Sequence, residues 1–334
     1  MSHSQKNKSA IGLDIGTSRI VAAFPKEDNQ FEFRSELNCF VSFPASKLTE
    51  SVLKREKIPH TVGATDIVVH GNESVRFADL LQIETRRPMN RGHINPAEPE
   101  SLNVIREIVA SLLGSPGGGR QVCFSVPAAP AGAQDSLTYH EASVRQVLTE
   151  MGYQARPINE GLAVIYAELE ASNYTGVGIS CGGGLCNVCL AYLAVPVLNF
   201  SLAKAGDYID ASAASVTGER ANSIRMLKEH DFHLNGASAD KIQQALTVYY
   251  DDMIQTLISG LKDAFAAARA TSKLGRPVPL VLSGGTVVPQ GFRERFETSL
   301  ADSGLALPIS EVLVAENPLH STAKGALISA LSEG

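Results

Sequence analysis

Apolar residues in the first half of the chain follow two spacings, one typical of strands and one of helices. The stretch "AIGLDIGTSRIVAAF" (10–24) is apolar on both sides of a glycine turn and lacks a helical period, which predicts strand, turn and strand. "SLNVIREIVASLLG" (101–114) has apolar residues at helical intervals and ends on Gly114, which predicts a helix. "QVCFSVPA" (121–128) predicts a buried strand and "HEASVRQVLTEMG" (140–152) another amphipathic helix. This alternation predicts an α/β domain with a largely wound sheet.

Two segments depart from the alternation. Residues 35–83 are mixed in composition and predict short strands and a short helix, interpreted as an insertion in the first domain. Residues 207–272 are rich in helical patterns, and their longest one covers 240–270. Each half is therefore expected to carry a smaller subdomain.

The second half begins again with a glycine hairpin, "TGVGISCGGGLCNV" (175–188). Later, "PVPLVLSGGTVVPQGF" (277–292) predicts a strand that ends in a Gly-Gly-Thr turn. "NPLHSTAKGALISAL" (317–331) predicts a closing helix with Pro318 at its start, where a missing N–H costs nothing.

The two glycine hairpins align with each other. Gly12 falls on Gly178 and Gly16 on Gly182, while Asp14 falls on Ser180. Because one such hairpin opens each half, the sequence predicts two related halves that face each other across a cleft.

Composition and charge exclude several classes. A chain of 334 residues has room for two core-bearing domains, and 44% hydrophobic with 19% charged residues is ordinary for a soluble protein. The net charge of −6 gives no reason for direct nucleic-acid binding. No apolar stretch reaches the roughly 18 residues of a membrane span. The polar start "MSHSQKNKSA" carries no secretion signal and no evident membrane anchor, which predicts a cytoplasmic protein.

The cysteines and histidines are weak candidates for a metal site. Cys181, Cys186 and Cys189 cluster around a glycine turn, but they provide three ligands where zinc normally takes four. They are interpreted as small apolar fillers of a buried strand pair. His230 and His233 in "HDFH" are interpreted as part of a polar loop.

Asp14 is the first candidate for chemistry, because a carboxylate inside an apolar strand is costly without a partner. The neighbouring glycines allow backbone N–H groups to approach an anion, and Thr17 and Ser18 add hydroxyls. A Walker or Rossmann glycine loop would open a helix, whereas this one opens a strand. Two interpretations stay open for this stretch: a phosphate-binding hairpin whose Asp faces Mg²⁺, and a plain hairpin whose Asp caps the turn.

Seven segments in order resemble the actin superfamily, and within it the bacterial MreB group. They are "GLDIGTSRI" (12–20), "RRPMNRGHINPAEPESLNVI" (86–105), the run 122–167 that ends in "INEGLAVIYA", "GISCGGGLCNV" (178–188), "VTGERANSIRMLKE" (216–229), "LVLSGGTVVPQGF" (280–292) and "ENPLHSTAKGALISAL" (316–331). The resemblance implies an α/β fold of two actin-like (ribonuclease-H-like) domains that face a nucleotide cleft, each with a smaller inserted subdomain. The first domain would cover 9–172, with a small subdomain at about 35–83, and a C-terminal helix at 316–334 would complete it. The second would cover 173–315, with a helical subdomain at about 207–261.

The resemblance also implies a role for each matching residue, with ATP and Mg²⁺ as cofactors. Asp14 would orient the metal through water, and Glu160 would position the attacking water. The alternative for Glu160 is an ordinary acid in the first turn of a helix. The remaining cofactor-binding residues are the first phosphate turn (Gly16, Thr17, Ser18), the second (Gly182, Gly183, Gly184), the ribose and base side (Glu219, Arg220) and the opposite wall (Gly284, Gly285, Thr286), with Arg225 or Lys228 as further candidates for the base.

Two residues depart from the family pattern. Ser180 stands where the family has Asp, and it keeps one hydrogen bond but loses the charge. Leu185 replaces the usual hydroxyl residue after the glycines. Because catalysis of phosphoryl transfer rests largely on positioning and electrostatics, the sequence predicts slow or impaired hydrolysis and intact nucleotide binding.

The leading expectation is an ATP-binding bacterial actin-like protein that polymerises head to tail with itself, with cytoskeletal or membrane-protein adaptors as candidate partners. Shape control, organelle positioning and DNA segregation all use this fold. A hydrolysis-deficient nucleotide-binding scaffold or partner-binding module without filaments is the alternative. A sugar or acid kinase of the same superfamily ranks last, and DnaK-type chaperones are disfavoured because no peptide-binding domain follows.

Overall fold

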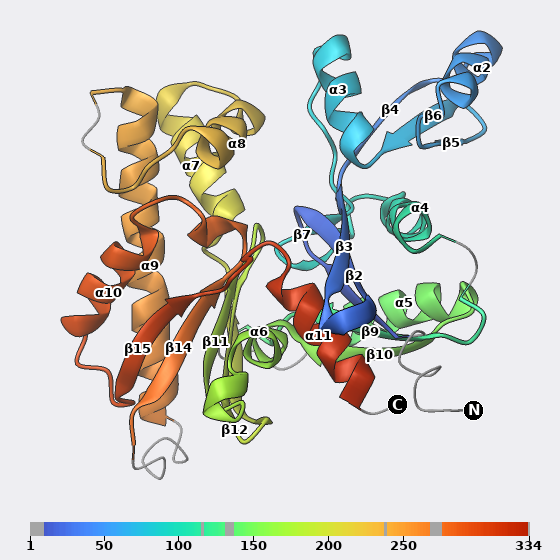
Figure 1. Cartoon of the computed structure of the whole chain (residues 1–334). Helices are drawn as coiled ribbons and strands as arrows, with labels where there is room; N and C mark the ends of the chain where they lie inside the picture. The colour runs from blue at the N-terminus through green and yellow to red at the C-terminus, as the bar shows by residue number, and fades with distance from the viewer. Residues whose placement is uncertain (1–9, 115–116, 131–136, 237–238, 268–275, 333–334) are drawn as a thin grey trace.

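Two five-stranded sheets stand side by side in the computed structural model (Figure 1). The structure describes residues 10–114, 117–130, 137–236, 239–267 and 276–332. Within these ranges, no helix combines the length and the apolar character that crossing a membrane would require.

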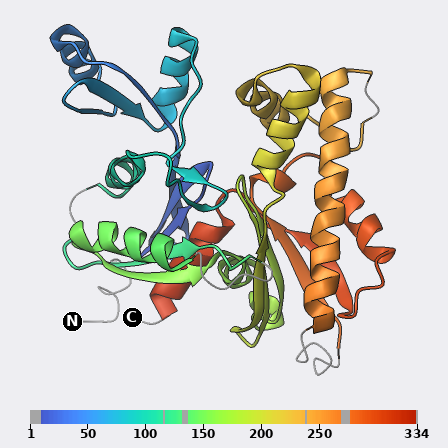
Figure 2. The same ribbon diagram turned by 180° about the vertical axis from the view of Figure 1, so that it is seen from behind.

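The first sheet has the strand order β10-β9-β1-β2-β3. Its strands are β1 (Ile11–Ile15), β2 (Arg19–Pro25), β3 (Phe31–Leu37), β9 (Gln121–Val126) and β10 (Gln154–Asn159). β1, β9 and β10 are parallel, whereas β1, β2 and β3 form an antiparallel meander. Helices α4 (Ser101–Leu113) and α5 (Leu137–Glu150) cover one face of this sheet (Figure 2). The predicted strands and helices of this half are thus confirmed.

A small subdomain rises from the end of the first sheet (Figure 1). It contains a three-stranded sheet of β4 (Phe40–Pro44), β6 (Asp66–His70) and β5 (His60–Val62), with helices α2 (Lys47–Arg55) and α3 (Asn72–Leu81). Its own core is a cluster around Val41, Leu53 and Ile67. The predicted insertion had been placed from about residue 35, but residues up to Leu37 belong to β3 of the main sheet. A short hairpin, β7 (Met89–Asn90) and β8 (His93–Ile94), leads back to α4.

The second sheet repeats the first, with the order β13-β12-β11-β14-β15. Its strands are β11 (Gly176–Cys181), β12 (Cys186–Tyr192), β13 (Val195–Leu202), β14 (Val278–Ser283) and β15 (Ile309–Val314). β11, β12 and β13 are antiparallel, and β14 and β15 run parallel to β11. The same strand order and directions in both sheets confirm the predicted internal repeat.

The helix-rich part consists of α7 (Gly206–Thr217), α8 (Ala221–His230) and the long α9 (Lys241–Ala267), while α10 (Phe292–Ala301) precedes β15. Apolar residues along α9 pack into the core beneath the second sheet, among them Leu246, Tyr250, Leu257 and Phe265. The predicted helical pattern from 240 is confirmed as far as Ala267, and residues 268–272 lie outside the described residues.

Helices α6 (Glu160–Glu168) and α11 (Ser321–Ser332) cross between the two sheets (Figure 1). α6 follows the first sheet but packs on β11 and β12 of the second, whereas α11 follows the second sheet and packs on β1 and β9 of the first. The two helices touch closely, because a Cβ at Gly325 would overlap the backbone of Ala163. This exchange of helices joins the halves through one shared apolar cluster.

The closing helix begins later than predicted. α11 begins at Ser321, and Pro318 lies in the preceding turn. The Pro318 carbonyl accepts hydrogen bonds from the Gly284 amide (3.0 Å) and the Ser283 hydroxyl (3.1 Å). These bonds tie the turn to the end of β14, so the chain enters the helix only after them.

Candidate functional site

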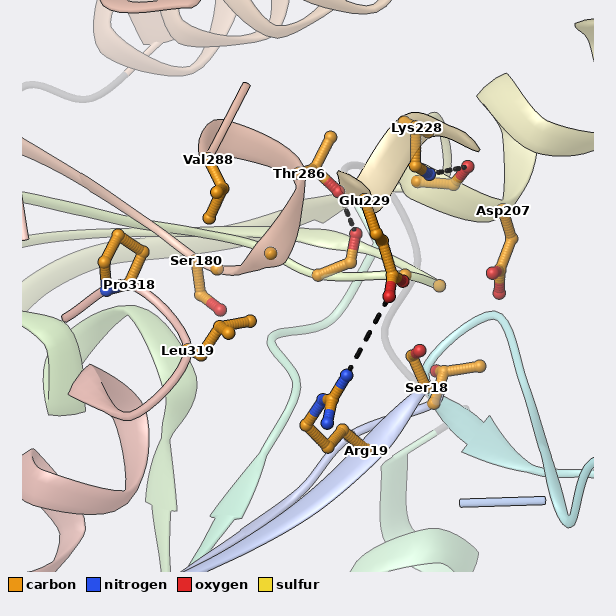
Figure 3. Close-up of a pocket in the computed structure, with 18 of the residues that line it drawn as sticks. Ser18, Arg19, Ser180, Asp207, Lys228, Glu229, Thr286, Val288, Pro318 and Leu319 are labelled. Carbon is orange, nitrogen blue, oxygen red and sulfur yellow. Dashed lines mark hydrogen bonds and ion pairs between the residues drawn. The ribbon is translucent and has the colours of Figure 1, made fainter. Parts of the chain in front are cut away.

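A cavity of about 480 Å³ lies between the two sheets, and residues of both halves line it. Both glycine turns line it, together with the first turn of α6 and residues of α7 and α8. Figure 3 shows Ser18 beside the first turn, Asp207 of α7 and Lys228 of α8 around it. The sequence-predicted residues that line it are Asp14, Gly16, Thr17, Ser18, Glu160, Gly182, Gly183, Gly184, Gly284, Gly285 and Thr286. The fold therefore brings together residues from almost the whole length of the chain.

The two glycine turns have the same backbone hydrogen bond. The Gly16 amide donates to the Arg19 carbonyl at 3.0 Å, and the Gly182 amide donates to the Leu185 carbonyl at 2.9 Å. In each hairpin the strand before the turn ends at the residue preceding the glycine. The turns thus present equivalent peptide groups to the cavity from its two sides.

The β7–β8 turn joins the two glycine turns at one end of the cavity. The Gly92 amide donates to the Thr17 hydroxyl at 3.0 Å. Gly184 of the second turn lies so close to the β7–β8 turn that an added Cβ would meet the Gly92 nitrogen at 2.5 Å. A Cβ added at Gly92 would in turn overlap the Leu185 side chain. Leu185, one of the two departures from the family pattern, is buried in this contact.

Asp14 is held by a hydroxyl from the neighbouring strand. The Ser125 hydroxyl on β9 donates to Asp14 Oδ1 at 2.7 Å and accepts from the Ile15 amide at 3.0 Å. Because an amide can only donate, the hydroxyl proton is left for the carboxylate. Sequence reasoning missed Ser125, although a serine inside the apolar strand "VCFSVP" marks a buried polar group that needs a partner.

Glu160 begins α6 and is held by two residues of the second hairpin. The Asn187 side-chain amide donates to Glu160 Oε2 at 2.9 Å, and the Ser180 hydroxyl donates to the same oxygen at 3.3 Å. The Ala128 amide donates to Asn187 Oδ1 at 2.8 Å, which leaves the Asn187 NH₂ group to face Glu160. Asn187 was also missed, and its signal was a polar residue inside the apolar strand "CNVCL".

The two carboxyl groups are partly buried and line the same cavity. Burial raises the pKa of Glu160, the nearby Asp14 charge raises it further, and the hydrogen bonds from Ser180 and Asn187 oppose the rise. Burial also raises the pKa of Asp14, against the hydrogen bond from Ser125. The raised pKa values therefore favour protonation of at least one of the two groups over two negative charges, unless a cation compensates them.

The side of the cavity formed by α7 and α8 carries a chain of ion pairs. Lys228 Nζ lies 2.6 Å from Asp210 Oδ1 and 3.2 Å from the Gly206 carbonyl, and Arg225 Nε lies 3.2 Å from Asp210 Oδ2. Glu229 points across the cavity towards Arg19 of the first hairpin, at 3.9 Å (Figure 3). These contacts connect α8 with both halves of the molecule.

Two predicted residues lie elsewhere. Glu219 and Arg220 sit in the turn before α8 and are not among the residues that line the cavity. Arg220 instead faces Glu84, at 4.0 Å. α8 begins at Ala221, so its later residues Arg225 and Lys228 reach the cavity, together with Glu229.

The predicted residues Gly284, Gly285 and Thr286 form the wall behind the second glycine turn. The Thr286 hydroxyl donates to the Gly182 carbonyl at 2.8 Å and so fixes this turn against the end of β14. Gly284 has φ of +92°, a conformation that side chains rarely adopt, and a Cβ added there would overlap the backbone of Cys181.

The cysteines pack in cores instead of lining the cavity. Cys181 and Cys186 are buried within the core of the second half, and Cys189 lies in the cluster shared by α6 and α11. Among the described residues, no group of three or more His, Cys, Asp or Glu is arranged to hold a metal ion. His230 and His233 line the cavity, with Phe232 buried between them.

The donor set of the cavity fits a Mg²⁺–nucleotide. Carboxylate and hydroxyl oxygens are the ligands that Mg²⁺ prefers, and it usually takes one or two carboxylates together with phosphate oxygens. Two glycine turns bring peptide groups close to the position where phosphates would lie between them. The partly buried carboxyl pair, with raised pKa values, is a place where a cation would be stabilised.

Comparisons with known proteins agree with this geometry. The family model described as Volactin matches residues 9–330. No curated protein matches the sequence. A MamK double helical filament is 16% identical with a TM-score of 0.73, covering 97% of this chain and 98% of that one. A non-polymerising MamK mutant bound to AMPPNP is 16% identical with a TM-score of 0.59, covering 96% and 98%.

The ethanolamine utilization protein EutJ from Carboxydothermus hydrogenoformans is 15% identical with a TM-score of 0.57, covering 95% of this chain and 88% of that one. These similarities confirm the predicted two-domain, actin-like α/β fold. The narrower resemblance to the MreB group stays a prediction.

Proposed function

The chain belongs to the Volactin family, and on that premise we propose that it binds ATP with Mg²⁺ in the cavity and polymerises head to tail into filaments. The observation that carries the proposal is the pair of equivalent glycine turns on opposite sides of the cavity, with Asp14 and Glu160 between them. Two similar structures support it, because one is a MamK filament and the other a MamK mutant bound to AMPPNP.

Each residue then has a definite task. The peptide groups at 16–18 and 182–184 would hold the phosphates, and Asp14 would hold the metal with its orientation set by Ser125. Bound Mg²⁺ would supply the positive charge that neutralises the phosphates. Arg225, Lys228 and Glu229 on α8 replace Glu219 and Arg220 as the residues assigned to the ribose and base side.

Glu160 would orient the attacking water, with Ser180 and Asn187 fixing its Oε2 atom. Since both partners are neutral donors, the second hairpin supplies no charge of its own to the metal. Slow hydrolysis therefore stays part of the proposal, with Ser180 as its physical reason.

Nucleotide binding is tested by titrating a fluorescent ATP analogue in Mg²⁺ and in EDTA. We expect binding in both, and tighter binding with Mg²⁺. Sedimentation with ATP and Mg²⁺, followed by electron microscopy, tests the filament. A chain that binds no nucleotide in either buffer would contradict the proposal at its first step.

A second candidate is a nucleotide-binding scaffold that hydrolyses poorly and forms no filament, and the neutral Ser180 favours it. It would bind the nucleotide but stay monomeric under every nucleotide condition. The sedimentation experiment therefore separates the two candidates directly.

A further inference from the structure

An ion pair joins the two halves of the chain beside the second glycine turn. Arg87 lies in the segment that leads into β7, and its Nη1 donates at 2.7 Å to Oδ1 of Asp207 in the first turn of α7. The Arg87 side chain is 16% exposed and the Asp207 side chain 33%. Charges that are partly buried in this way are screened less by salt than a surface pair. The pair is therefore able to respond to another charge that enters the cavity.

The Asp207 carboxylate lies between the two glycine turns. The Asp207 amide donates to the Gly183 carbonyl at 2.8 Å. A Cβ added at Gly183 would meet Asp207 Oδ1 at 3.3 Å and the Ser18 Cβ at 3.2 Å. Figure 3 shows the carboxylate of Asp207 directed towards the side of the cavity that carries Ser18. Asp207 thus places a negative charge next to the space in which the proposed phosphates would lie.

Two arginines converge on this carboxylate. Arg87 Nη1 lies 2.7 Å from Asp207 Oδ1, and Arg225 Nη2 lies 3.8 Å from the same atom. Arg225 is also held by Asp210, whose Oδ2 lies 3.2 Å from Arg225 Nε. Among the described residues, Asp207 is the one acid that pairs with Arg87. Since a guanidinium forms the same kind of charged hydrogen bonds with a carboxylate and with a phosphate, Arg87 can exchange one partner for the other.

We propose that Arg87 binds the terminal phosphate of the nucleotide, and that Asp207 holds its guanidinium until this phosphate arrives. An unpaired and partly buried charge is costly, and the exchange gives Arg87 an anionic partner in both states. Asp207 lines the cavity, whereas Arg87 is not among the lining residues, so the carboxylate has to turn aside. Arg225, at 3.8 Å, is the cation to which Asp207 can turn.

This inference rests on the proposed nucleotide binding and adds the residue that distinguishes a triphosphate from a diphosphate. A nucleotide without the terminal phosphate would leave the Arg87–Asp207 pair intact. One with that phosphate would gain the hydrogen bonds of Arg87 but would have to compete with Asp207 for them. Asp207 therefore lowers the affinity for the triphosphate that Arg87 provides.

A fixed ion pair that only holds the two halves together is the alternative. The two interpretations predict opposite effects of Asp207→Asn, which keeps the size of the side chain and removes its charge. Loss of a fixed pair would leave Arg87 unpaired and weaken the binding of every nucleotide. Loss of a competitor would free Arg87 and tighten the binding of a triphosphate.

Calorimetric titration of AMPPNP and of ADP in Mg²⁺ measures these effects. Arg87→Gln should weaken AMPPNP binding by about 10- to 100-fold and ADP binding by less than about threefold, because only AMPPNP carries the terminal phosphate. Arg87→Lys should lose less, since it keeps the charge but not the planar fork of the guanidinium.

Asp207→Asn should tighten AMPPNP binding by about three- to tenfold, and ADP binding by less. This gain should largely disappear when Arg87→Gln is added, because no guanidinium is then left to be freed. A gain of the same size in both backgrounds would mean that Asp207 merely repels phosphates, and it would overturn the exchange.

Arg76→Gln on α3 is the matched control, because it removes the same charge from the same half of the chain. Arg76 is 58% exposed, pairs with Glu73 and is not among the residues that line the cavity. It should bind both nucleotides as the wild type does. Circular dichroism and urea unfolding show whether each variant is folded. If Arg87→Gln does not fold, the sign of the effect of Asp207→Asn still decides between the two interpretations.

Failure of the inference differs from failure of the proposed function. A wild-type chain that binds neither AMPPNP nor ADP would overturn both. A wild type that binds both, with equal losses for the two nucleotides in Arg87→Gln, would overturn the inference alone. Weaker AMPPNP binding by Asp207→Asn would do the same and would show that the pair is a fixed link between the halves.

Discussion

The hairpins β1–β2 and β11–β12 have the same backbone and different chemistry. Their pairing registers are equivalent, since Asp14 lies opposite Val21 and Ser180 lies opposite Asn187. Each has the same turn hydrogen bond, and each has a glycine beneath a crossing helix, Gly12 under α11 and Gly178 under α6. The repeat therefore preserves the positions that close packing requires.

The side chains that face the cavity do not repeat. The first hairpin carries a carboxylate with an apolar residue opposite, and the second carries a hydroxyl with an amide opposite. Ser180 and Asn187 both donate to Glu160, so the second hairpin holds a carboxylate that another element supplies. Where the first hairpin carries the carboxylate Asp14, the second thus carries one of two neutral donors to Glu160.

The glycines beneath the crossing helices offer the strongest test of the shared backbone. In Gly12→Ala the new Cβ would overlap the Ala323 carbonyl of α11, and in Gly178→Ala it would overlap the Gly161 carbonyl of α6. Because backbone cannot move aside cheaply, each change should lower the free energy of unfolding by about 3 kcal/mol or more. Urea unfolding monitored by circular dichroism measures both.

Gly236→Ala is the control, because its new Cβ would lie 3.8 Å from the nearest atom. It should change the free energy of unfolding by no more than about 0.5 kcal/mol. If only one of the two buried glycines proved sensitive, the equivalence of the two halves would be lost.

Exchanging the polar residues tests the different chemistry. Asp14→Ser makes the first hairpin resemble the second and should weaken Mg²⁺–ATP binding by about 10- to 100-fold, because the metal loses its carboxylate. Ser180→Asp should speed phosphate release several-fold in saturating Mg²⁺, since it adds charge beside the metal. Without divalent cations the same variant should melt at lower temperature, because a further carboxylate is buried beside Glu160.

Calorimetric titration and a phosphate-release assay provide these measurements. Equal effects of the two exchanges on binding would mean that the hairpins share one task after all. No turnover in wild type or in Ser180→Asp would favour the scaffold over an ATPase.

The raised pKa values predict a smaller, pH-dependent effect. Native Asp14 and Glu160 keep protons that the unfolded chain has lost above its ordinary carboxyl pKa, so ionising them disfavours the folded state as pH rises. Burial lowers the pKa values of His70 and His140 to about 4. These two histidines therefore make the folded state more stable as pH rises near pH 5 to 6, which is opposite to the effect of the carboxyl pair. The comparison of Glu160→Gln with wild type isolates the contribution of the carboxyl pair to the pH dependence of stability, because the histidines are the same in both proteins.

The stability of Glu160→Gln relative to wild type should rise by about 1 to 3 kcal/mol between pH 5 and pH 8 in EDTA. Urea unfolding at both pH values measures it. An equal change in the free energy of unfolding of both proteins between the two pH values would show that Glu160 has the same pKa in the native and unfolded states.

Local patterns in the sequence predicted the hairpins, because the glycine spacing and the flanking apolar runs determine the turn by themselves. Asp14 was found in the same way, as an acid inside an apolar strand, whereas Glu160 was named only through the resemblance to the MreB group. Ser125 and Asn187 were missed because their partners are 111 and 27 residues away, and only the sheet and the crossing helix bring them together.

The position of Glu219 and Arg220 outside the cavity has a related cause. The residues of an amphipathic helix that face a cavity depend on where the helix begins, and a shift of a few residues exchanges one face for another. Sequence reasoning placed Glu219 and Arg220 at the cavity, whereas the helix begins after both of them. Arg225 and Lys228, named as further candidates, line the cavity, and so does Glu229, which was not named.

The smallest expected effect concerns the last residue of each turn, where Arg19 in the first hairpin corresponds to Leu185 in the second. Leu185 is buried against Gly92, whereas Arg19 is about one-third exposed and faces Glu229 at 3.9 Å. An exposed pair at that distance contributes little to stability, so Arg19→Leu should change the free energy of unfolding by no more than about 0.5 kcal/mol. Its effect should appear instead in nucleotide binding, which should weaken a few-fold in low salt and less in high salt, because screening removes the attraction between a guanidinium and phosphates. Titrations at two ionic strengths measure this difference. A large loss of stability would show that the Arg19–Glu229 pair, like Leu185, belongs to the packing of the cleft.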